Sequence, residues 1–200
     1  RAVVAAEALV DGQVVKRDEW EILFRFYGLS GLVILNLSES VAPFVDGGTV
    51  SVRINFFPGV SADELEERLR HRWNRHPYRT VAFSFTGLLP DKIAPVLLPL
   101  MDILPDRPAA GISAAEGRRI AEGLTGWEVR VLGSRTFAEA EVMVGGIVTD
   151  DVDPQTMESR IVPGLFFAGE MLDVHGDLGG FNFQWAWSSG WVAGQGEGWQ

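Results

Sequence analysis

The sequence predicts an α+β fold: a β-rich, mostly antiparallel region with a small helical subdomain, followed by a strand–loop–helix segment. Three observations support this prediction. Apolar and polar residues alternate with the period of a strand near residues 1–26, 50–56 and 127–144. Two helix-start signals lie between the second and third of these stretches and predict a helical subdomain at about residues 59–125. A short apolar run near the end of the chain stops at a glycine and leads into a polar loop and an aromatic-rich stretch.

The first residues favour paired strands. Ala2–Val4, Gln13–Val15 and Glu21–Phe26 are mainly apolar, and Asp11-Gly12 separates the first two runs. Asp-Gly between apolar runs is typical of a two-residue hairpin turn, because both central residues of that turn need positive φ. We therefore expect an antiparallel pairing at the start of the chain.

A glycine-bounded interruption, Gly28-Leu29-Ser30-Gly31, follows these strands and precedes the apolar run Leu32–Leu37. The run itself fits either a buried strand or a helix. Serine is a favoured N-cap because its hydroxyl accepts a hydrogen bond from a free backbone N–H group. We therefore expect a helix over Leu32–Leu37 with Ser30 as its cap.

The stretch Val50–Phe56 shows the clearest strand alternation in the chain. Ser61 and Glu64 then have the spacing of a capping box, in which each side chain bonds the backbone of the other residue. This spacing predicts a helix that runs to about Arg75 and stops before Pro77.

A second capping box, Ser113 with Glu116, predicts a helix that ends near Gly126. Between the two helices, Pro90–Met101 has helical spacing but contains prolines. Pro99 inside a helix would cost about 3 kcal/mol, so we expect a kink or two short pieces there. Strands return over Trp127–Val131 and, with period two, over Phe137–Val144.

Near the end of the chain, Leu165–Ala168 predicts a buried strand that stops at a tight turn on Gly169. The loop that follows carries Glu170, Asp173, His175 and Asp177, and it ends at Gly179-Gly180, where no Cβ prevents positive φ or a close ligand.

The next stretch fits two structures. Phe181, Phe183, Trp185 and Trp187 alternate with smaller or polar residues, which favours an aromatic hairpin. Read instead with the helical period, the stretch becomes a helix with a small-residue face, whose N-terminal N–H groups would face a ligand beyond the strand end. In both cases we expect these aromatic side chains to lie mainly in the core.

Composition narrows the function classes. The 200 residues are 46% hydrophobic, contain no cysteine and carry a net charge of −10. The absence of cysteine excludes disulfides, thiolate metal sites and a cysteine nucleophile. So acidic a chain predicts no nucleic-acid partner. Prolines interrupt its longest apolar region, Val81–Leu104, which predicts no membrane partner either, and we expect a cytoplasmic protein without a visible signal peptide.

Other chemistry has weaker support in the sequence. The histidines His71 and His76 fall on or beside a charged helix, which is typical of a solvated surface. His175, Asp173 and Asp177 lack the spacing of a known metal motif, so we predict no metal site. No serine has a histidine or an acid at a spacing that suggests a nucleophile, and the catalytic residues stay unknown.

Several motifs together resemble the signatures of the NAD(P)/FAD-dependent oxidoreductases known as aminoacetone-oxidase-like or bile-acid-dehydroxylation-type flavoproteins. They are Glu21–Arg25, Tyr27–Gly31, Gly145–Thr149, Asp153–Ser159, Val162–Glu170, Leu172–Val174 and Gly179–Gly190. In that family a barrel-like β-rich domain is inserted into a Rossmann-like FAD-binding domain. The resemblance implies that residues 1–143 are the inserted domain, with its helical subdomain at about 59–125, and that residues 144–200 are the C-terminal segment of the FAD domain.

The resemblance also implies the cofactor site. Gly169 and Glu170 would end the last strand, Glu170 or Asp173 would bond the ribityl hydroxyls, and Gly179 to Gln184 would begin a helix that faces the flavin. The residues implied for FAD are Gly169, Glu170, Asp173, Gly179, Gly180, Phe181, Asn182 and Phe183. The same resemblance leads us to expect Leu165–Ala168 as a strand and Asn182–Gly190 as a helix, against the strand count.

By this resemblance the chain is part of an FAD-dependent oxidoreductase that acts on a small-molecule substrate, with NAD(P)H as a candidate reductant. The family's first strand, G-x-G-x-x-G turn and helix should precede this sequence, and no such motif occurs in it. A dinucleotide needs both halves of its domain, so we expect the chain alone to bind FAD weakly and to be inactive without its N-terminal partner half. The alternative is a non-catalytic, β-rich binding or interaction module.

Overall fold

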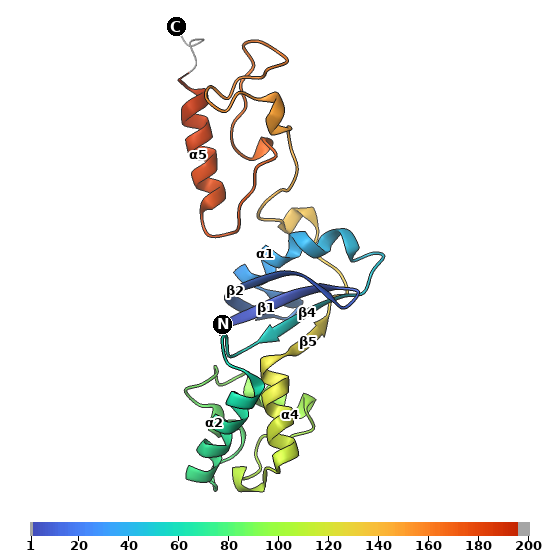
Figure 1. Ribbon diagram of the computed structural model, residues 1–200, viewed down its shortest axis with the longest axis vertical. Coiled ribbons are helices and arrows are strands. Elements are labelled where there is room, and N and C mark those ends of the chain that lie inside the picture. Colours follow the sequence, from blue (N-terminus) through green and yellow to red (C-terminus); the bar gives the residue numbers. More distant parts are fainter. Residues whose placement is uncertain (1, 196–200) are drawn as a thin grey trace. The chain divides into compact units, whose positions relative to one another are not determined.

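The computed structural model describes residues 2–195, which divide into two compact units on either side of Gly133 (Figure 1). The first unit contains one sheet and a group of helices. The second unit contains one long helix and a set of loops and short turns.

The first unit is built on a five-stranded antiparallel sheet in the order β3-β2-β1-β4-β5. Its strands are β1 (Ala2–Val10), β2 (Gln13–Arg25), β3 (Gly28–Ser30), β4 (Val50–Asn55) and β5 (Trp127–Arg130). The expected hairpin is confirmed, since Asp11 and Gly12 have φ of 50° and 80° between β1 and β2. The sheet is open, with β3 and β5 as its edges, so the antiparallel character is confirmed without closure of a barrel.

One face of this sheet carries charges of alternating sign on neighbouring strands. Glu7 lies opposite Arg17 and Arg53, and Arg53 lies opposite Glu128. All three pairs form salt bridges of 2.7 to 3.1 Å. The hydrogen bond from Arg17 lowers the pKa of the Glu7 carboxyl, and the Ser51 hydroxyl and then Arg53 lower that of Glu128. This face is therefore polar, as in many antiparallel sheets.

The other face is buried by helix α1 (Leu32–Val41), which packs Val33, Leu37 and Val41 against it. The expected helix is confirmed, but the expected cap at Ser30 is wrong. Ser30 is the last residue of β3, and the N-cap is Gly31, with φ of 94° and no side-chain bond. The turn between strand and helix is too tight for a residue with a side chain, because a Cβ at Gly31 would lie 2.5 Å from Glu21 O.

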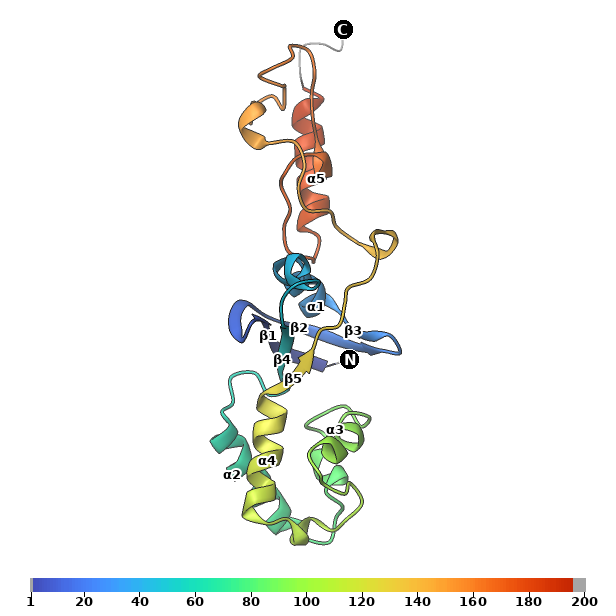
Figure 2. The ribbon, with the colours of Figure 1, turned by 90° about the vertical axis from the view of Figure 1, so that its right-hand side faces the viewer.

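A helical subdomain follows β4 and makes up the remainder of the first unit (Figure 2). It consists of α2 (Ala62–Arg75), α3 (Ala94–Leu100) and α4 (Ala114–Thr125), with short 3₁₀ turns η1 (Ala42–Phe44), η2 (Ala82–Phe85) and η3 (Ala109–Gly111) elsewhere in the unit. Ser61 and Ser113 both cap their helices as expected, but only Ser113 and Glu116 form the full capping box, because the Glu64 side chain pairs with Arg68 instead. Helix α3 is one short piece with Pro99 inside it.

The subdomain shares its core with the sheet. Leu65, Leu69 and Trp73 lie one turn apart on α2 and are buried in one cluster with strand residues such as Ile54. The indole N–H of Trp73 donates to Ser84 Oγ at 2.9 Å, which satisfies its one polar atom inside the core.

The capping box of α4 predicts an acid-sensitive contribution to stability. The hydrogen bond from Arg107, with those from the N–H and hydroxyl of Ser113, lowers the pKa of Glu116 from 4.5 to about 2. A carboxyl with a lowered pKa in the folded state stabilises the fold above pH 4.5, and that contribution is lost as the pH falls toward 2. We expect Glu116→Gln to flatten the fall in melting temperature over this range. Thermal melts from pH 7 to pH 2.5 test this, with Glu19→Gln, whose carboxylate accepts no bond among residues 2–195, as the control. Equal slopes in the two variants would contradict the prediction.

The second unit has little regular structure apart from α5 (Phe181–Ala193). Its other elements are the 3₁₀ turns η4 (Phe137–Glu139), η5 (Thr149–Asp151) and η6 (Gly169–Met171). A small buried cluster of Val152, Met157 and Leu172 holds the loops against the helix.

Two expected strands of this unit are wrong. Phe137–Val144 begins with η4 and continues irregularly, and of Leu165–Ala168 only Phe166 forms a single bridge, with Glu158. Two backbone hydrogen bonds flank that bridge, from Ser159 N–H to Leu165 O and from Phe167 N–H to Met157 O, but among the described residues the pairing extends no further. A strand is stable only when a neighbouring backbone satisfies its N–H and C=O groups along its length. The boundary expected at residues 143 and 144 stays a prediction, since the compact units divide at Gly133.

Candidate functional site

The candidate site is the N-terminus of α5. The expected helix is confirmed and the alternative hairpin is wrong, because the chain is helical from Phe181 to Ala193. Gly180 is the N-cap with φ of 101°, Gly179 precedes it with φ of 133°, and no side chain among residues 2–195 caps the helix. The first intrahelical bond runs from Gln184 N–H to Gly180 O at 3.0 Å. The N–H groups of Phe181, Asn182 and Phe183 lie ahead of that bond and point out of the helix end, toward water or a ligand.

The space around Gly180 is open. A Cβ built on it would meet nothing within 4 Å, whereas a Cβ on Gly146 or Gly31 would collide with backbone. Glycine is therefore needed at 180 for its positive φ, and the empty space in front of it leaves the helix end accessible. The partial positive charge of a helix N-terminus makes this end suited to an anion or to a group that gains negative charge.

Asn182 fixes the loop that leads into the helix. Its Oδ1 accepts from Gly176 N–H at 2.9 Å, and its Nδ2 donates to Gly176 O at 2.8 Å. Both polar atoms of the side chain are thus used within the protein. Asn182 positions the loop, and only its backbone N–H remains for a cofactor.

Gly169 lies against the middle of α5. Its N–H donates to Ser189 Oγ at 2.9 Å, and its carbonyl accepts from Trp185 Nε1 at 3.2 Å. Ser189 is buried and its hydroxyl also donates to Trp185 O at 2.7 Å. With φ of 71° and the Ala186 side chain beside it, Gly169 is part of a close helix–loop contact.

The two acidic residues expected at the cofactor differ in their bonding. Glu170 Oε1 accepts from Met143 N–H at 2.7 Å, so this carboxylate holds a loop. The Asp173 side chain is exposed, and among residues 2–195 its carboxylate accepts no hydrogen bond. Only the backbone of Asp173 is paired, through a 2.9 Å bond to Ile147 O.

Most aromatic side chains of α5 are exposed, so the expected burial of these side chains is wrong. We expected them mainly in the core, but four of them are 66% to 69% exposed: Phe181, Phe183, Trp187 and Trp191. Trp185 alone packs with the small cluster of the second unit. The helix has apolar residues on all sides, so periodicity gave no face that could be assigned to the interior.

Some residues that shape the site were not singled out from the sequence. Ser189 has no predicted role in the sequence, yet it joins α5 to Gly169. Gly146 has φ of 159°, and a Cβ there would come within 2.7 Å of Leu172 C. The adjacent glycines at 145 and 146 were the available signal for such a close approach.

The described part of the chain contains neither a group of side chains placed to hold a metal ion nor a helix that could cross a membrane. Residues 2–195 contain no cluster of three or more histidine or acidic side chains placed to hold a metal ion. None of the helices in the same range has the length and apolar character needed to cross a bilayer.

Comparison with known proteins gives one family model and several relatives. The model of the HI0933-like protein Rossmann domain matches residues 27–196. The chain is 37% identical over 194 residues to the ribosomal RNA dihydrouridine synthase of Escherichia coli, covering 97% of this chain and 45% of that protein. It is 33% identical over 189 residues to a 3-dehydro-bile acid delta(4,6)-reductase of Clostridium scindens, covering 94% and 46%. The Haemophilus influenzae ribosomal RNA dihydrouridine synthase is 34% identical over 172 residues, covering 86% and 41%. The chain thus spans about half the length of the curated relatives it matches.

Proposed function

The chain belongs to the HI0933-like Rossmann-domain family of FAD-binding oxidoreductases, and we propose that it is the part of a flavin-dependent reductase that holds the flavin's reactive end. In this proposal residues 144–200 complete the FAD-binding domain, and the sheet with its helical subdomain is inserted and covers the substrate. The observation that carries the proposal is the open, uncapped N-terminus of α5 behind Gly179-Gly180.

The named activities of the relatives suggest the reaction class. A delta(4,6)-reductase of a 3-dehydro bile acid and a dihydrouridine synthase both saturate a ring carbon–carbon double bond that is conjugated to a carbonyl group. Such a reduction adds a hydride to one carbon of the double bond and a proton to the other. We propose the same class of reaction here, with a conjugated ring as substrate and NAD(P)H as the source of reducing equivalents.

The described residues fit a flavin at the helix end. Gly180 leaves open space in front of the amides of Phe181, Asn182 and Phe183, and no lysine or arginine lies in the loop from Gly169 to Gly180. These amides would stabilise the negative charge of the reduced ring, and the helix dipole adds to that effect. When bound, the flavin supplies the hydride, while the chain contributes binding, orientation and exclusion of water.

The acidic residues take different parts in this proposal. Asp173 is the better candidate to accept hydrogen bonds from ribityl hydroxyls, because its carboxylate is exposed and accepts no bond within residues 2–195. Glu170 and Gly169 support the site from behind, Glu170 through Met143 and Gly169 through Ser189. The proton donor to the substrate is not assigned.

The test uses the longest chain that the gene encodes. We expect purified protein to carry flavin and, after anaerobic reduction, to be reoxidised by a cyclic conjugated ketone or by uridine within RNA. Return of the oxidised flavin's absorbance at a rate that rises with acceptor concentration would support the proposal. A non-catalytic binding module would carry no flavin, and a flavoprotein that neither acceptor reoxidises would belong to another reaction class. Either result would contradict the proposal.

A further inference from the structure

The first unit contains a concentration of positive charge that the net charge of the chain hides. Residues 68–79 contain five of the seventeen lysines and arginines in the whole chain, together with two histidines and no acidic residue. This run covers the second half of α2 and the segment just after it. An acidic total therefore coexists with a strongly basic local surface.

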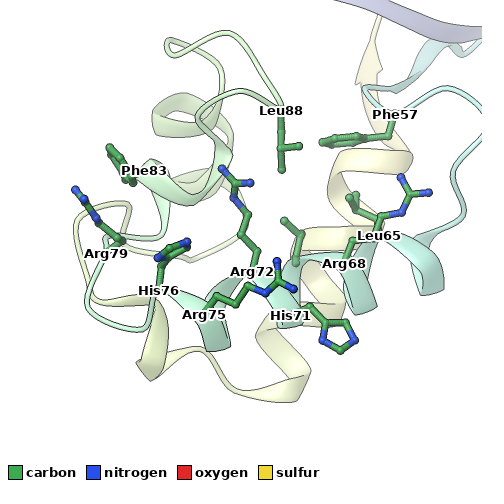
Figure 3. A pocket seen from close by; sticks show the side chains of 11 residues that line it. Phe57, Leu65, Arg68, His71, Arg72, Arg75, His76, Arg79, Phe83 and Leu88 are labelled. Atoms are coloured by element: carbon green, nitrogen blue, oxygen red, sulfur yellow. The ribbon is translucent and has the colours of Figure 1, made fainter.

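All of these arginines and histidines except Arg70 line a cavity of about 440 Å³ in the helical subdomain (Figure 3). Arg68, Arg72 and Arg75 come from α2, and Arg79 comes from the segment that follows it. Leu65 and Leu69 belong to the buried face of α2 and form the floor of the cavity. We call the four arginines with His71 and His76 the arginine groove.

Part of the charge in the arginine groove is not neutralised by the protein. Arg68 pairs with Glu64, and Arg72 donates to the Thr86 carbonyl at 2.7 Å. Arg75 and Arg79, in contrast, have no carboxylate partner anywhere in residues 2–195. Arginines that only complement the C-terminus of a helix would need no cavity or aromatic neighbours, so the helix dipole does not account for the whole arrangement.

Exposed aromatic rings lie beside the arginines. The Arg79 guanidinium sits 4.5 Å from the centre of the Phe83 ring, which is 47% exposed and lines the cavity. Tyr78, next to Arg79 in the chain, is 92% exposed. Positive groups interleaved with exposed rings are what a single-stranded nucleic acid needs, because phosphates bind the charges and bases stack on the rings.

We propose that the arginine groove binds the phosphate backbone of a single-stranded RNA segment. Along α2, Arg68 and Arg75 are separated by a rise of about 10 Å, and Arg79 extends the row beyond the helix end. A single free phosphate would contact only one or two of these groups, whereas consecutive phosphates of a strand can meet the whole row. The inference deepens the proposed function and rests on it only for the choice of RNA as substrate, a choice that the ribosomal RNA relatives also favour.

The test measures RNA binding without flavin or turnover. The probe is a fluorescein-labelled single-stranded RNA of about twelve nucleotides, titrated with protein at several salt concentrations. Removal of one arginine that binds a phosphate should lower the slope of log K against log salt by about 0.7. For Arg75→Gln with Arg79→Gln we therefore expect at least about tenfold weaker binding at low salt and a slope smaller by about 1.4.

The matched control is Arg70→Gln with Arg130→Gln, which removes the same charge. Both residues are exposed, lie outside the cavity and have no ion-pair partner among the described residues. Equal weakening by both double variants would show a nonspecific charge effect and overturn the proposal, as would no binding by the parent protein. Competition by inorganic phosphate as effective as that by unlabelled RNA would assign the groove to a small anion and overturn the proposal too.

If circular dichroism shows the groove double variant to be misfolded, the single variant Arg79→Gln provides the test, with an expected slope change of about 0.7. Failure here leaves the reductase test unaffected, since that test uses flavin reoxidation with two kinds of acceptor.

Discussion

Gly180→Val is expected to remove flavin from the holoprotein while the chain stays folded. Gly180 has φ of 101°, so a β-branched residue there costs on the order of 1–2 kcal/mol in backbone strain. Its Cβ would meet no protein atom within 4 Å among the described residues, so it would project into the open space at the helix end, where we propose that the flavin binds. We expect flavin affinity to fall more than about tenfold. Absorbance of the protein from the longest chain, after dialysis against known flavin concentrations, gives the measurement.

Gly164→Val is the control that distinguishes the effect of backbone strain from the effect of a side chain placed at the helix end. Gly164 also has positive φ, 78°, and also has nothing within 4 Å of a built Cβ, but it lies in a loop before Gly169. Both substitutions should lower the melting temperature of the flavin-free protein by a similar amount, and only Gly180→Val should lose flavin. Full flavin content in Gly180→Val would mean that Gly179-Gly180 is an ordinary turn and that the cofactor lies elsewhere.

Local signals predicted the first unit well. Asp11-Gly12, Ser61 and Ser113 each act through backbone groups a few residues away, so their effect can be read without knowledge of the tertiary structure. The strand predicted from alternation at Val50–Phe56 is also confirmed as β4, because one face of that strand is buried and the other is polar. Where the sequence specifies both the local conformation and the buried face, the expected element forms.

The second unit shows where such reading fails. Leu165–Ala168 has the composition of a buried strand, but only Phe166 finds a bridge in the described chain. Trp187, expected in the core, is 68% exposed, while Trp185 packs inward and bonds Gly169. Strand pairing and burial depend on distant partners, and α5 has apolar residues on every side. Its helical state was expected only from the family resemblance, because periodicity could not choose between helix and hairpin.

The candidate sites show a similar limit. The glycines and amides of the α5 N-terminus could be expected from their family motif, but the bonds of Asn182 to Gly176 could not, because they depend on the path of the loop. Net charge alone is a weak basis for excluding a partner. A total of −10 says little about residues 68–79, which are entirely basic or neutral, because charge acts mainly within about one Debye length.

Gly31→Ala is expected to have the largest effect on stability of any single methyl addition considered. A Cβ at Gly31 would lie 2.5 Å from Glu21 O and 2.9 Å from Leu23 N, both backbone atoms of β2. Neither atom can move without breaking the sheet next to β3, and the φ of 94° adds strain for any residue with a side chain. Gly31 O also accepts hydrogen bonds from the N–H groups of Ile34 and Leu35 in the first turn of α1, so a shift there would disturb the helix start.

The expected loss exceeds about 4 kcal/mol, the range reached only by severe steric or burial defects, and urea unfolding followed by tryptophan fluorescence measures it. Gly28→Ala is the matched control. Gly28 lies at the other end of β3, has φ of 139°, and offers nothing within 4 Å of a built Cβ. The Gly28→Ala substitution adds the same methyl group and backbone strain but no collision, so it should lower the free energy of unfolding by only about 1 kcal/mol. If both variants unfold at the same urea concentration, the close approach of Gly31 to β2 does not determine the strand–helix junction, and positive φ alone explains the glycine.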